Sequence, residues 1–135
     1  METEPVTDDD RELVRLAEEL LAKCHVPGRH RCSSALRTTS GEVYTGINLI
    51  AGGRADVHSE QAAYANAVAA GDDDVATSVA VMYEDDDASK PMQVEPACGV
   101  CREFFYTFAP EVDIIFPRDN ELEKAPLSAL LPVKQ

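Results

Sequence analysis

The first pattern along the chain is an amphipathic helix over residues 10–23. Its apolar positions recur three or four residues apart among charged residues, at Leu13, Leu16, Ala17, Leu20 and Leu21. Such spacing gathers the apolar side chains on one face, so the helix is expected to pack that face on a core. Pro27 and Gly28 follow and end the helical pattern.

Short β-compatible segments and continuous apolar runs predict the strands. Residues 31–38 and 42–48 are joined by a turn that ends in glycine, which predicts a hairpin. Residues 75–83 and 112–116 are apolar almost throughout, as expected for strands that are buried on both faces. A short strand is expected over residues 92–94. The run over 75–83 is the expected middle of one sheet.

Helical patterns fill the spaces between these strands. Residues 58–70 are rich in alanine and end at a glycine, and a second helix is expected over residues 98–108. A last short helix is expected over residues 126–131. Strands that alternate with helices predict an α/β domain in which helices cover one sheet. All 135 residues fit a single domain, with residues 1–9 as a flexible acidic N-terminal segment.

The net charge and the lengths of the apolar runs indicate which classes of binding partner are not expected. The chain has 25 Asp and Glu residues against 12 Lys and Arg residues, a formal net charge of −13. A surface that binds a nucleic acid polymer needs Lys and Arg to neutralise phosphates, so no such polymer is expected as substrate. No apolar run has the length that spans a bilayer, and the N-terminus is acidic, so no membrane contact is expected. A cytoplasmic location follows by default.

Four residues in two short motifs carry the candidate chemistry. His58 and Glu60 form His-x-Glu, and Cys98 and Cys101 form Cys-x-x-Cys. A catalytic zinc ion takes three protein ligands and keeps one position open, and His58, Cys98 and Cys101 would supply those ligands. Cysteines three residues apart in a first helical turn lie on one side of the helix, where the helix dipole favours thiolate. Glu60 is placed to transfer protons beside this centre.

Two other interpretations of these residues stay open. In the first, His58 is a hydrogen-bonded core histidine and Cys98 and Cys101 are a redox pair without a metal. In the second, Cys24 or Cys32 adds a fourth ligand and closes a structural zinc site, which has no open position for chemistry. Cys24 and Cys32 are otherwise expected to be small buried side chains.

The order of the motifs, with His-x-Glu before Cys-x-x-Cys, resembles the signature of zinc deaminases, although Pro96-Ala97-Cys98 has one residue more between the proline and the cysteine than that signature has. The chain is similar to the cytidine deaminase superfamily, in particular to its short cytidine and blasticidin S deaminases, over nearly its whole length. Further matching segments are Thr45-Gly46-Ile47-Asn48, Cys98-Gly99-Val100-Cys101-Arg102-Glu103 and Leu130-Leu131-Pro132. The resemblance implies a three-layer fold in which a mixed five-stranded sheet is packed between helices. It also implies a homotetramer with sites near the subunit interfaces, and a dimer is the alternative.

The same resemblance implies an enzyme that hydrolyses a C–N bond of a cyclic amidine. The implied cofactor is Zn²⁺ on His58, Cys98 and Cys101, with Glu60 passing protons from the attacking water to the ring nitrogen and the leaving ammonia. The default substrate is a small pyrimidine nucleoside or base, cytidine or deoxycytidine, which would become uridine or deoxyuridine. The alternatives are a blasticidin S-like or modified base, and a non-catalytic zinc-binding protein of the same fold.

Departures from the family pattern concern the substrate. Short cytidine deaminases usually have Cys where this chain has His58, and their ribose-binding Asn-x-Glu becomes Asn48-Leu49-Ile50. Asn48 keeps the amide for substrate binding, but a ribose hydroxyl loses its carboxylate partner at Ile50, as in the blasticidin-type enzymes. Counting without gaps places His30 at the position of the family's ring-stacking Phe, so His30 is a second candidate substrate-binding residue.

Overall fold

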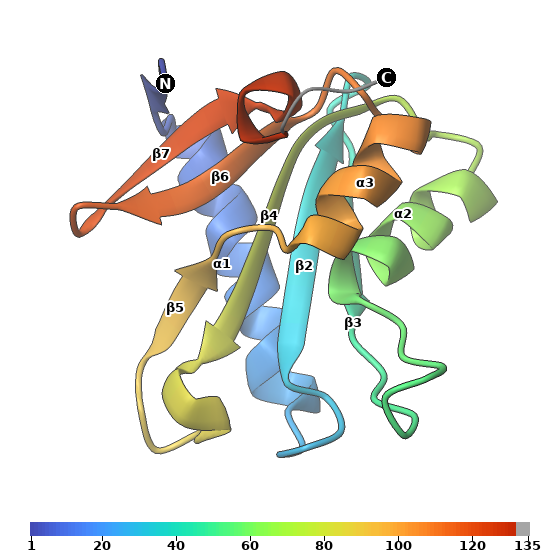
Figure 1. Cartoon of the computed structure of the whole chain (residues 1–135), viewed down its shortest axis with the longest axis vertical. Helices are drawn as coiled ribbons and strands as arrows, with labels where there is room; N and C mark the ends of the chain where they lie inside the picture. Colours follow the sequence, from blue (N-terminus) through green and yellow to red (C-terminus); the bar gives the residue numbers. More distant parts are fainter. Residues whose placement is uncertain (132–135) are drawn as a thin grey trace.

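A mixed sheet forms the centre of the protein in the computed structural model, which describes residues 1–131. Pro132, at the end of the family-like closing segment, lies outside the described residues. The strands are β1 (Glu4–Pro5), β2 (Cys32–Thr38), β3 (Val43–Ile47), β4 (Val75–Tyr83), β5 (Met92–Glu95), β6 (Asp113–Arg118) and β7 (Glu121–Pro126). Their order across the sheet is β1-β7-β6-β4-β2-β3, and β5 pairs with β4 (Figure 1).

Strand β4 lies in the middle of this sheet, as the apolar run over residues 75–83 predicted. One edge of β4 pairs antiparallel with β2. The other edge pairs first parallel with β6, at Thr77 and Ser78, and then antiparallel with β5. The other pairings between the described strands are antiparallel. The mixed α/β architecture expected from the sequence is therefore confirmed.

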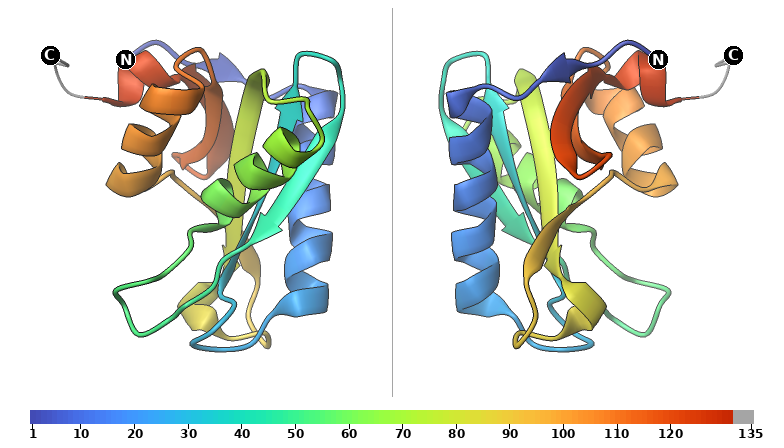
Figure 2. Two further views of the ribbon diagram at one scale, coloured as in Figure 1. Left: turned by 90° about the vertical axis from the view of Figure 1, so that its right-hand side faces the viewer. Right: turned by 90° about the vertical axis from the view of Figure 1, so that its left-hand side faces the viewer.

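Three helices cover the sheet: α1 (Asp8–Cys24), α2 (Ser59–Ala69) and α3 (Gly99–Phe108). Figures 1 and 2 show α1 on one face of the sheet and α2 and α3 on the opposite face, so the molecule has three layers. Two short 3₁₀ turns, Glu84–Asp86 and Leu127–Leu130, complete the described helical elements. Within residues 1–131, no helix combines the length and apolar character needed to cross a membrane.

Two strands extend the sheet beyond the five that the sequence predicted. β7 forms a hairpin with β6, and β1 pairs with the outer edge of β7 at Glu123 and Lys124. The hairpin turn, Asp119 and Asn120, has φ angles of 50° and 68°, which are typical of tight turns between twisted strands. The sheet is therefore seven-stranded, and the added strands lie on the side of β6.

The N-terminal residues 1–9, expected to be a flexible acidic segment, contain β1 and the start of α1. Thr7 caps α1, because its Oγ1 accepts a hydrogen bond from the N–H of Asp10 at 3.1 Å. Asp10 Oδ2 in turn accepts one from the N–H of Thr7 at 2.9 Å. Lys124 Nζ of β7 lies 2.9 Å from the same Asp10 oxygen, so the start of α1 is tied to the sheet.

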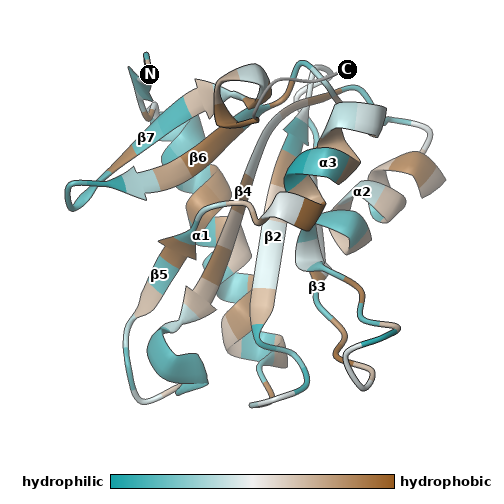
Figure 3. Ribbon diagram, viewed as in Figure 1, coloured by the Kyte–Doolittle hydropathy of each residue, from teal (hydrophilic) through white to brown (hydrophobic). Residues whose placement is uncertain are grey.

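Each face of the sheet has its own apolar core. On one face, Leu13, Ala17 and Leu21 of α1 are fully buried, as their spacing predicted. On the other face, Cys101 and Phe105 of α3 are fully buried in a separate cluster with residues of α2. Figure 3 shows hydrophobic residues along β4 and β6, which lie between the two helical layers. The helices are thus held by opposite faces of the same central strands.

A glycine in β3 lets α2 lie directly against the sheet. A Cβ atom at Gly46 would come within 2.2 Å of the backbone N of Ala63 and 2.7 Å of the carbonyl O of Ser59. No larger residue fits without moving the helix, which gives the Thr-Gly-x-Asn segment a mechanical reason for its glycine. The close contact fixes the start of α2, next to His58 and Glu60.

Candidate active site

The N-terminal ends of α2 and α3 bring together three side chains that could hold a metal ion, which we call the metal-binding cluster. His58, Cys98 and Cys101 each offer one ligand atom, and these three atoms lie within 4.8 Å of one another. Within this group, Cys98 Sγ and His58 Nδ1 are 3.5 Å apart. Within the described part of the chain, this is the one such cluster of His, Cys and carboxylate side chains.

His58 and Cys98 occupy equivalent positions at the starts of their helices. Each is the residue immediately before the first helical residue, and each has an extended backbone. The His58 carbonyl accepts a hydrogen bond from the N–H of Ala62 at 3.0 Å, and the Cys98 carbonyl accepts one from the N–H of Arg102 at 2.9 Å. Cys101 follows in the first turn of α3. Helix initiation therefore fixes the backbone of all three residues.

Arg102 also holds the loop that leads into Cys98. Its Nε donates a hydrogen bond to the carbonyl O of Ala97 at 2.7 Å, and its Nη1 donates one to the carbonyl O of Leu130 at 3.0 Å. Both acceptors are backbone atoms, so the guanidinium joins the loop before α3 to the C-terminal 3₁₀ turn. Arg102 thus positions the thiol of Cys98 through the backbone.

The surroundings of Cys101 favour a cation between the three donors. Burial, followed by the nearby Glu60 and Cys98, raises the pKa of the Cys101 thiol above its usual range. A thiolate at this position therefore requires a compensating positive charge. A divalent metal ion held by one imidazole and two thiolates supplies that charge, so the donor set fits a metal ion.

Glu60 is buried beside this cluster. It lies in the first turn of α2, two residues after His58, and is 6% exposed. The Oγ of Ser59 donates a hydrogen bond to Glu60 Oε1 at 2.9 Å. A carboxylate that is shielded from bulk water next to a metal-binding cluster is suited to accept and return protons.

The cluster forms part of the wall of a cavity of about 370 Å³. Its lining residues are Arg31, Cys32, Asn48, His58, Glu60, Ala80, Met82, Glu95, Pro96 and Cys98. A smaller hollow of about 170 Å³ shares Arg31, Cys32, Asn48, His58 and Glu60 with the first, and it adds Ile50, Asp56, Val57 and Ser59. Because they share these residues, the two hollows are neighbouring parts of one depression. A depression of this size suits a small molecule.

The structure places Asn48 in the lining of both hollows. Its side-chain Oδ1 accepts hydrogen bonds from the backbone N–H of Arg31 at 2.6 Å and of Cys32 at 3.0 Å. A carbonyl oxygen has two lone pairs, and both are directed to these donors. The NH₂ of Asn48 is therefore the side-chain group left to donate to a ligand.

His30 does not line either hollow. Its Nδ1 lies 2.9 Å from the carbonyl O of Asn48, and its backbone pairs with that of Val26. The ring is thus engaged with the chain segment that follows β3. The structure does not bring His30 to the cavity beside the metal-binding cluster, although ungapped counting placed it at a ring-stacking position.

Cys24 and Cys32 do not join the metal-binding cluster. Cys24 ends α1, on the face of the sheet opposite α2 and α3. Cys32 lines the cavity, and burial raises the pKa of its thiol to about 12, so this thiol stays protonated near neutral pH. Three ligands beside a cavity have the composition of an open metal site, which counts against the closed four-ligand alternative.

Arg31 and Glu95 are charged residues that also line the cavity, and the sequence motifs did not include Glu95. Arg31 Nε lies 3.4 Å from Asp86 Oδ2, which restrains the arginine where it lines both hollows. Glu95 Oε1 accepts a hydrogen bond from Gln93 Nε2 at 3.3 Å. Glu95 precedes Cys98 by three residues, and this nearness to a metal motif was the signal available in the sequence. Arg31 reaches the cavity through the pairing of β2 with β4.

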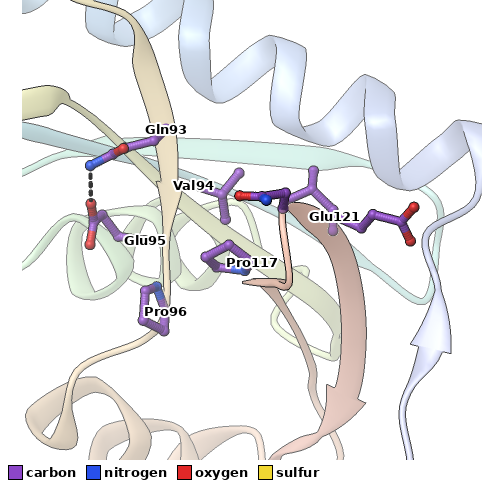
Figure 4. A pocket seen from close by; sticks show the side chains of 8 residues that line it. Gln93, Val94, Glu95, Pro96, Pro117 and Glu121 are labelled. Carbon is purple, nitrogen blue, oxygen red and sulfur yellow. Dashed lines mark hydrogen bonds between the residues drawn. The ribbon is translucent and has the colours of Figure 1, made fainter.

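A separate cavity of about 380 Å³ lies between β5 and the β6–β7 hairpin (Figure 4). Its lining consists of Gln93, Val94, Glu95, Pro96, Pro117, Asn120, Glu121 and Leu122. These residues include no histidine or cysteine and no basic side chain. Of these two cavities, only the one beside His58 and Cys98 is lined by histidine, cysteine and a basic side chain.

Comparison with known proteins gives one full-length relative. The chain is 31% identical over 136 residues to a blasticidin-S deaminase from Bacillus cereus, and the match covers 99% of this chain and 97% of the relative. No protein family model matches the chain.

Solved structures of cytidine deaminases share the fold. The cytidine deaminase from Bacillus anthracis has a TM-score of 0.78 at 21% identity, covering 92% of this chain and 87% of that one. The cytidine deaminase from Mycobacterium tuberculosis has a TM-score of 0.72 at 21% identity, covering 93% and 96% respectively. With this shared fold and a full-length relative above 30% identity, the chain belongs to the cytidine deaminase superfamily, as a homologue of blasticidin S deaminase.

Proposed function

We propose that this protein is a hydrolytic deaminase of a small pyrimidine-like nucleoside or base. The observation that carries the proposal is the convergence of His58, Cys98 and Cys101 within 4.8 Å, beside a cavity that the buried Glu60 also lines. The Bacillus cereus relative is a deaminase by name, and it aligns along the whole chain. Both observations support an enzyme that acts on the C–N bond of a cyclic amidine.

The proposed cofactor is Zn²⁺, held by His58, Cys98 and Cys101. One imidazole and two thiolates are a known ligand set for catalytic zinc, and three protein ligands leave a coordination position open. When bound, zinc acts as a Lewis acid that makes water a stronger nucleophile at neutral pH.

Glu60 is the proposed proton carrier. Hydrolysis requires one proton to move from the attacking water to the ring nitrogen, and a second proton to move from the hydroxyl group then bound to the ring carbon to the amine that departs as ammonia. Glu60 performs these transfers in turn, so the carboxylate returns to its starting state after each turnover. Its burial keeps bulk water from competing for the proton.

The side chains around the cavity support a small substrate. A cavity of about 370 Å³ holds a nucleoside-sized molecule, and the net charge of −13 disfavours a nucleic acid polymer. Asn48 is the proposed donor to the substrate through its NH₂. Cytidine or deoxycytidine is the default substrate.

A blasticidin-type substrate is the second candidate, and three observations favour it. The full-length relative is a blasticidin-S deaminase, and Ile50 in the smaller hollow offers no hydrogen bond to a ribose hydroxyl. Arg31 also places a positive charge in both hollows, which would attract a carboxylate on the substrate. Cytidine and deoxycytidine lack such a group, so charged analogues discriminate between the candidates.

Self-association and a cytoplasmic location complete the proposal. Val68 of α2 and Val100 and Phe108 of α3 are each about half exposed, at 49%, 54% and 52%. Exposed apolar side chains on two adjacent helices favour contact with a second copy of the chain, as a dimer or a tetramer. Cys98 and Cys101 form no disulfide, which suits the reducing conditions of the cytoplasm.

Ammonia release by the purified protein, with its zinc content measured, tests the proposed reaction. The substrates are cytidine, deoxycytidine, cytosine, blasticidin S, guanine and adenosine, and the Glu60→Gln variant is the blank. We expect this variant to keep its zinc and to lose activity by a factor on the order of 10² or more, because the amide cannot carry the proton.

The outcomes separate the enzyme from the non-catalytic alternative. Turnover that depends on Glu60 supports a deaminase and ranks the substrates. Equal turnover by wild type and Glu60→Gln contradicts the proposed proton carrier. Bound zinc without turnover on this panel or on a wider set of aminated heterocycles would favour a zinc-binding protein of the same fold.

A further inference from the structure

A series of hydrogen bonds between buried hydroxyl groups leads from the middle of the sheet to Glu60. Ser34 Oγ of β2 lies 3.0 Å from Ser59 Oγ at the start of α2, and Ser59 Oγ lies 2.9 Å from Glu60 Oε1. Ser34 is 0% exposed and Ser59 is 1% exposed. Neither serine was identified from the sequence motifs, because the contact between them joins residues 25 positions apart.

The number of hydrogens that each group can donate gives this series of hydrogen bonds a direction. Each serine hydroxyl has one hydrogen to donate, and an ionised carboxylate accepts only. Ser59 Oγ therefore donates its hydrogen bond to Glu60 Oε1, and Ser34 Oγ donates its hydrogen bond to Ser59 Oγ. Cys32 Sγ lies 3.5 Å from the Ser59 oxygen and makes a weaker contact with it.

We propose that Ser59, supported by Ser34, is a positioning residue that orients Glu60 for proton transfer. The inference rests on the proposed function of Glu60 as proton carrier. The donated hydrogen bond holds Oε1 toward the sheet side of α2. Oε2 is then the oxygen that exchanges protons with the reacting groups.

The position of Ser59 makes this arrangement rigid. Its carbonyl O is one of the atoms against which Gly46 packs, so the backbone of Ser59 is held by β3 while its hydroxyl is held by Ser34 of β2. An oriented carboxylate loses less conformational freedom when the transition state forms than a mobile one does. Removing the Ser59 hydroxyl should therefore slow the chemical step without changing substrate binding.

Ser59→Ala and Ser34→Ala test the proposal, and Ser33→Ala is the matched control. Ser33 is the neighbour of Ser34 in β2 and is equally buried, but its Oγ donates to the carbonyl O of Ala17 of α1 on the other face of the sheet. All three variants remove one buried hydroxyl and keep the β-carbon. Only Ser59→Ala and Ser34→Ala interrupt the series of hydrogen bonds that ends at Glu60.

We expect Ser59→Ala to lower kcat about tenfold with KM changed by less than about twofold and zinc content unchanged. Ser34→Ala should lower kcat less, and Ser33→Ala should leave it unchanged. In a protein that already carries Glu60→Gln, Ser59→Ala should cause no further loss. The proposal is overturned if Ser33→Ala lowers kcat as much as Ser59→Ala, if KM changes in place of kcat, or if the loss is the same in the Glu60→Gln background.

A stability measurement separates failure of this inference from failure of the proposed function. If the wild-type protein deaminates no substrate, the proposed function fails, and urea unfolding of Ser59→Ala, Glu60→Ala and the double variant then tests the contact alone. The proposal expects the two substitutions to be coupled, changing the unfolding equilibrium constant by about three- to tenfold relative to additivity. Additive effects would contradict the positioning contact.

Discussion

Cys98 Sγ lies 3.5 Å from His58 Nδ1, although 40 residues separate the two along the chain. The segment between them contains all of α2, β4 and β5. The metal-binding cluster therefore exists only in the folded protein. A metal ion that binds the folded chain more tightly than the unfolded chain must also stabilise the fold.

Replacing His58, Cys98 or Cys101 by Ala should abolish stoichiometric zinc binding and lower the melting temperature. Each variant removes one of three ligands, and the remaining two hold zinc weakly. Elemental analysis of the purified proteins and thermal unfolding with and without a chelator measure both effects. Cys24→Ala and Cys32→Ala serve as controls that should keep their zinc. Full zinc content in any of the first three variants would remove that residue from the ligand set.

Two substitutions at Asn48 should separate its structural contacts from its contact with substrate. Asn48→Asp keeps an oxygen that accepts from the N–H groups of Arg31 and Cys32, but it removes the NH₂ group. Asn48→Ala removes both. We expect Asn48→Asp to raise KM by about tenfold with little change in melting temperature, since one hydrogen bond to the substrate is lost. Steady-state kinetics and thermal unfolding of both variants make the comparison, and an unchanged KM for Asn48→Asp contradicts the donor role.

Gly46→Ala should destabilise the protein by about 1–3 kcal/mol, because the added methyl group forces α2 away from β3. The same displacement moves the start of α2, so weaker zinc binding should accompany the loss of stability. Gly99→Ala is the matched control, since a Cβ atom at Gly99 meets no atom within 4 Å. Chemical denaturation and zinc titration measure the two effects. Equal stability of both variants would show that β3 and α2 adapt to the extra atom.

The pair of Asp10 and Lys124 should contribute to stability at neutral pH and fail in acid. Burial opposes ionisation of Asp10, but the N–H of Thr7 and the Lys124 ammonium outweigh it and lower the pKa of this carboxyl group. A carboxyl group with a lowered folded-state pKa stabilises the fold above its unfolded-state pKa of about 3.8, and this contribution is lost as the pH falls further.

Asp10→Asn is the corresponding variant. Its unfolding free energy should lie below that of wild type at pH 7, and the difference should shrink as the pH approaches 3. Asp9→Asn, which removes the same charge from an exposed position in the same helical turn, should match wild type at pH 7. A difference between Asp10→Asn and wild type that is independent of pH would assign the effect to packing.

The sequence predicted those parts of the fold that have a local signature. Regular spacing predicted α1, and the continuous apolar run predicted β4. The motifs pointed to His58, Glu60, Cys98 and Cys101, which the fold brings to the neighbourhood of one cavity. β7 was missed because its residues, Glu121–Pro126, are mostly charged or half-exposed, as in a strand near the sheet margin. The turn at Asp119 and Asn120 was the available signal, since both residue types favour positive φ.

The remaining site residues depend on contacts that no local pattern encodes. Ser34 meets Ser59 only because α2 crosses β2 and β3 at Gly46, and Arg31 reaches the cavity only through the register of β2 against β4. His30 shows the converse. Its position in an ungapped count was suggestive, but the fold directs its ring nitrogen to the backbone of Asn48. Tertiary geometry therefore decides which polar residues of these loops face the cavity.

The placement of His58 and Cys98 immediately before their helices has a consequence for how this protein can change over time. The proposed chemistry depends on two helical starts, and no residue of α2 or α3 beyond its first turn is among those that line the two hollows. Substitutions on the outer faces of these helices are therefore separated from the proposed metal ligands and from the cavity. Natural variation, or protein engineering, can thus change the proposed self-association and the proposed reaction independently of each other.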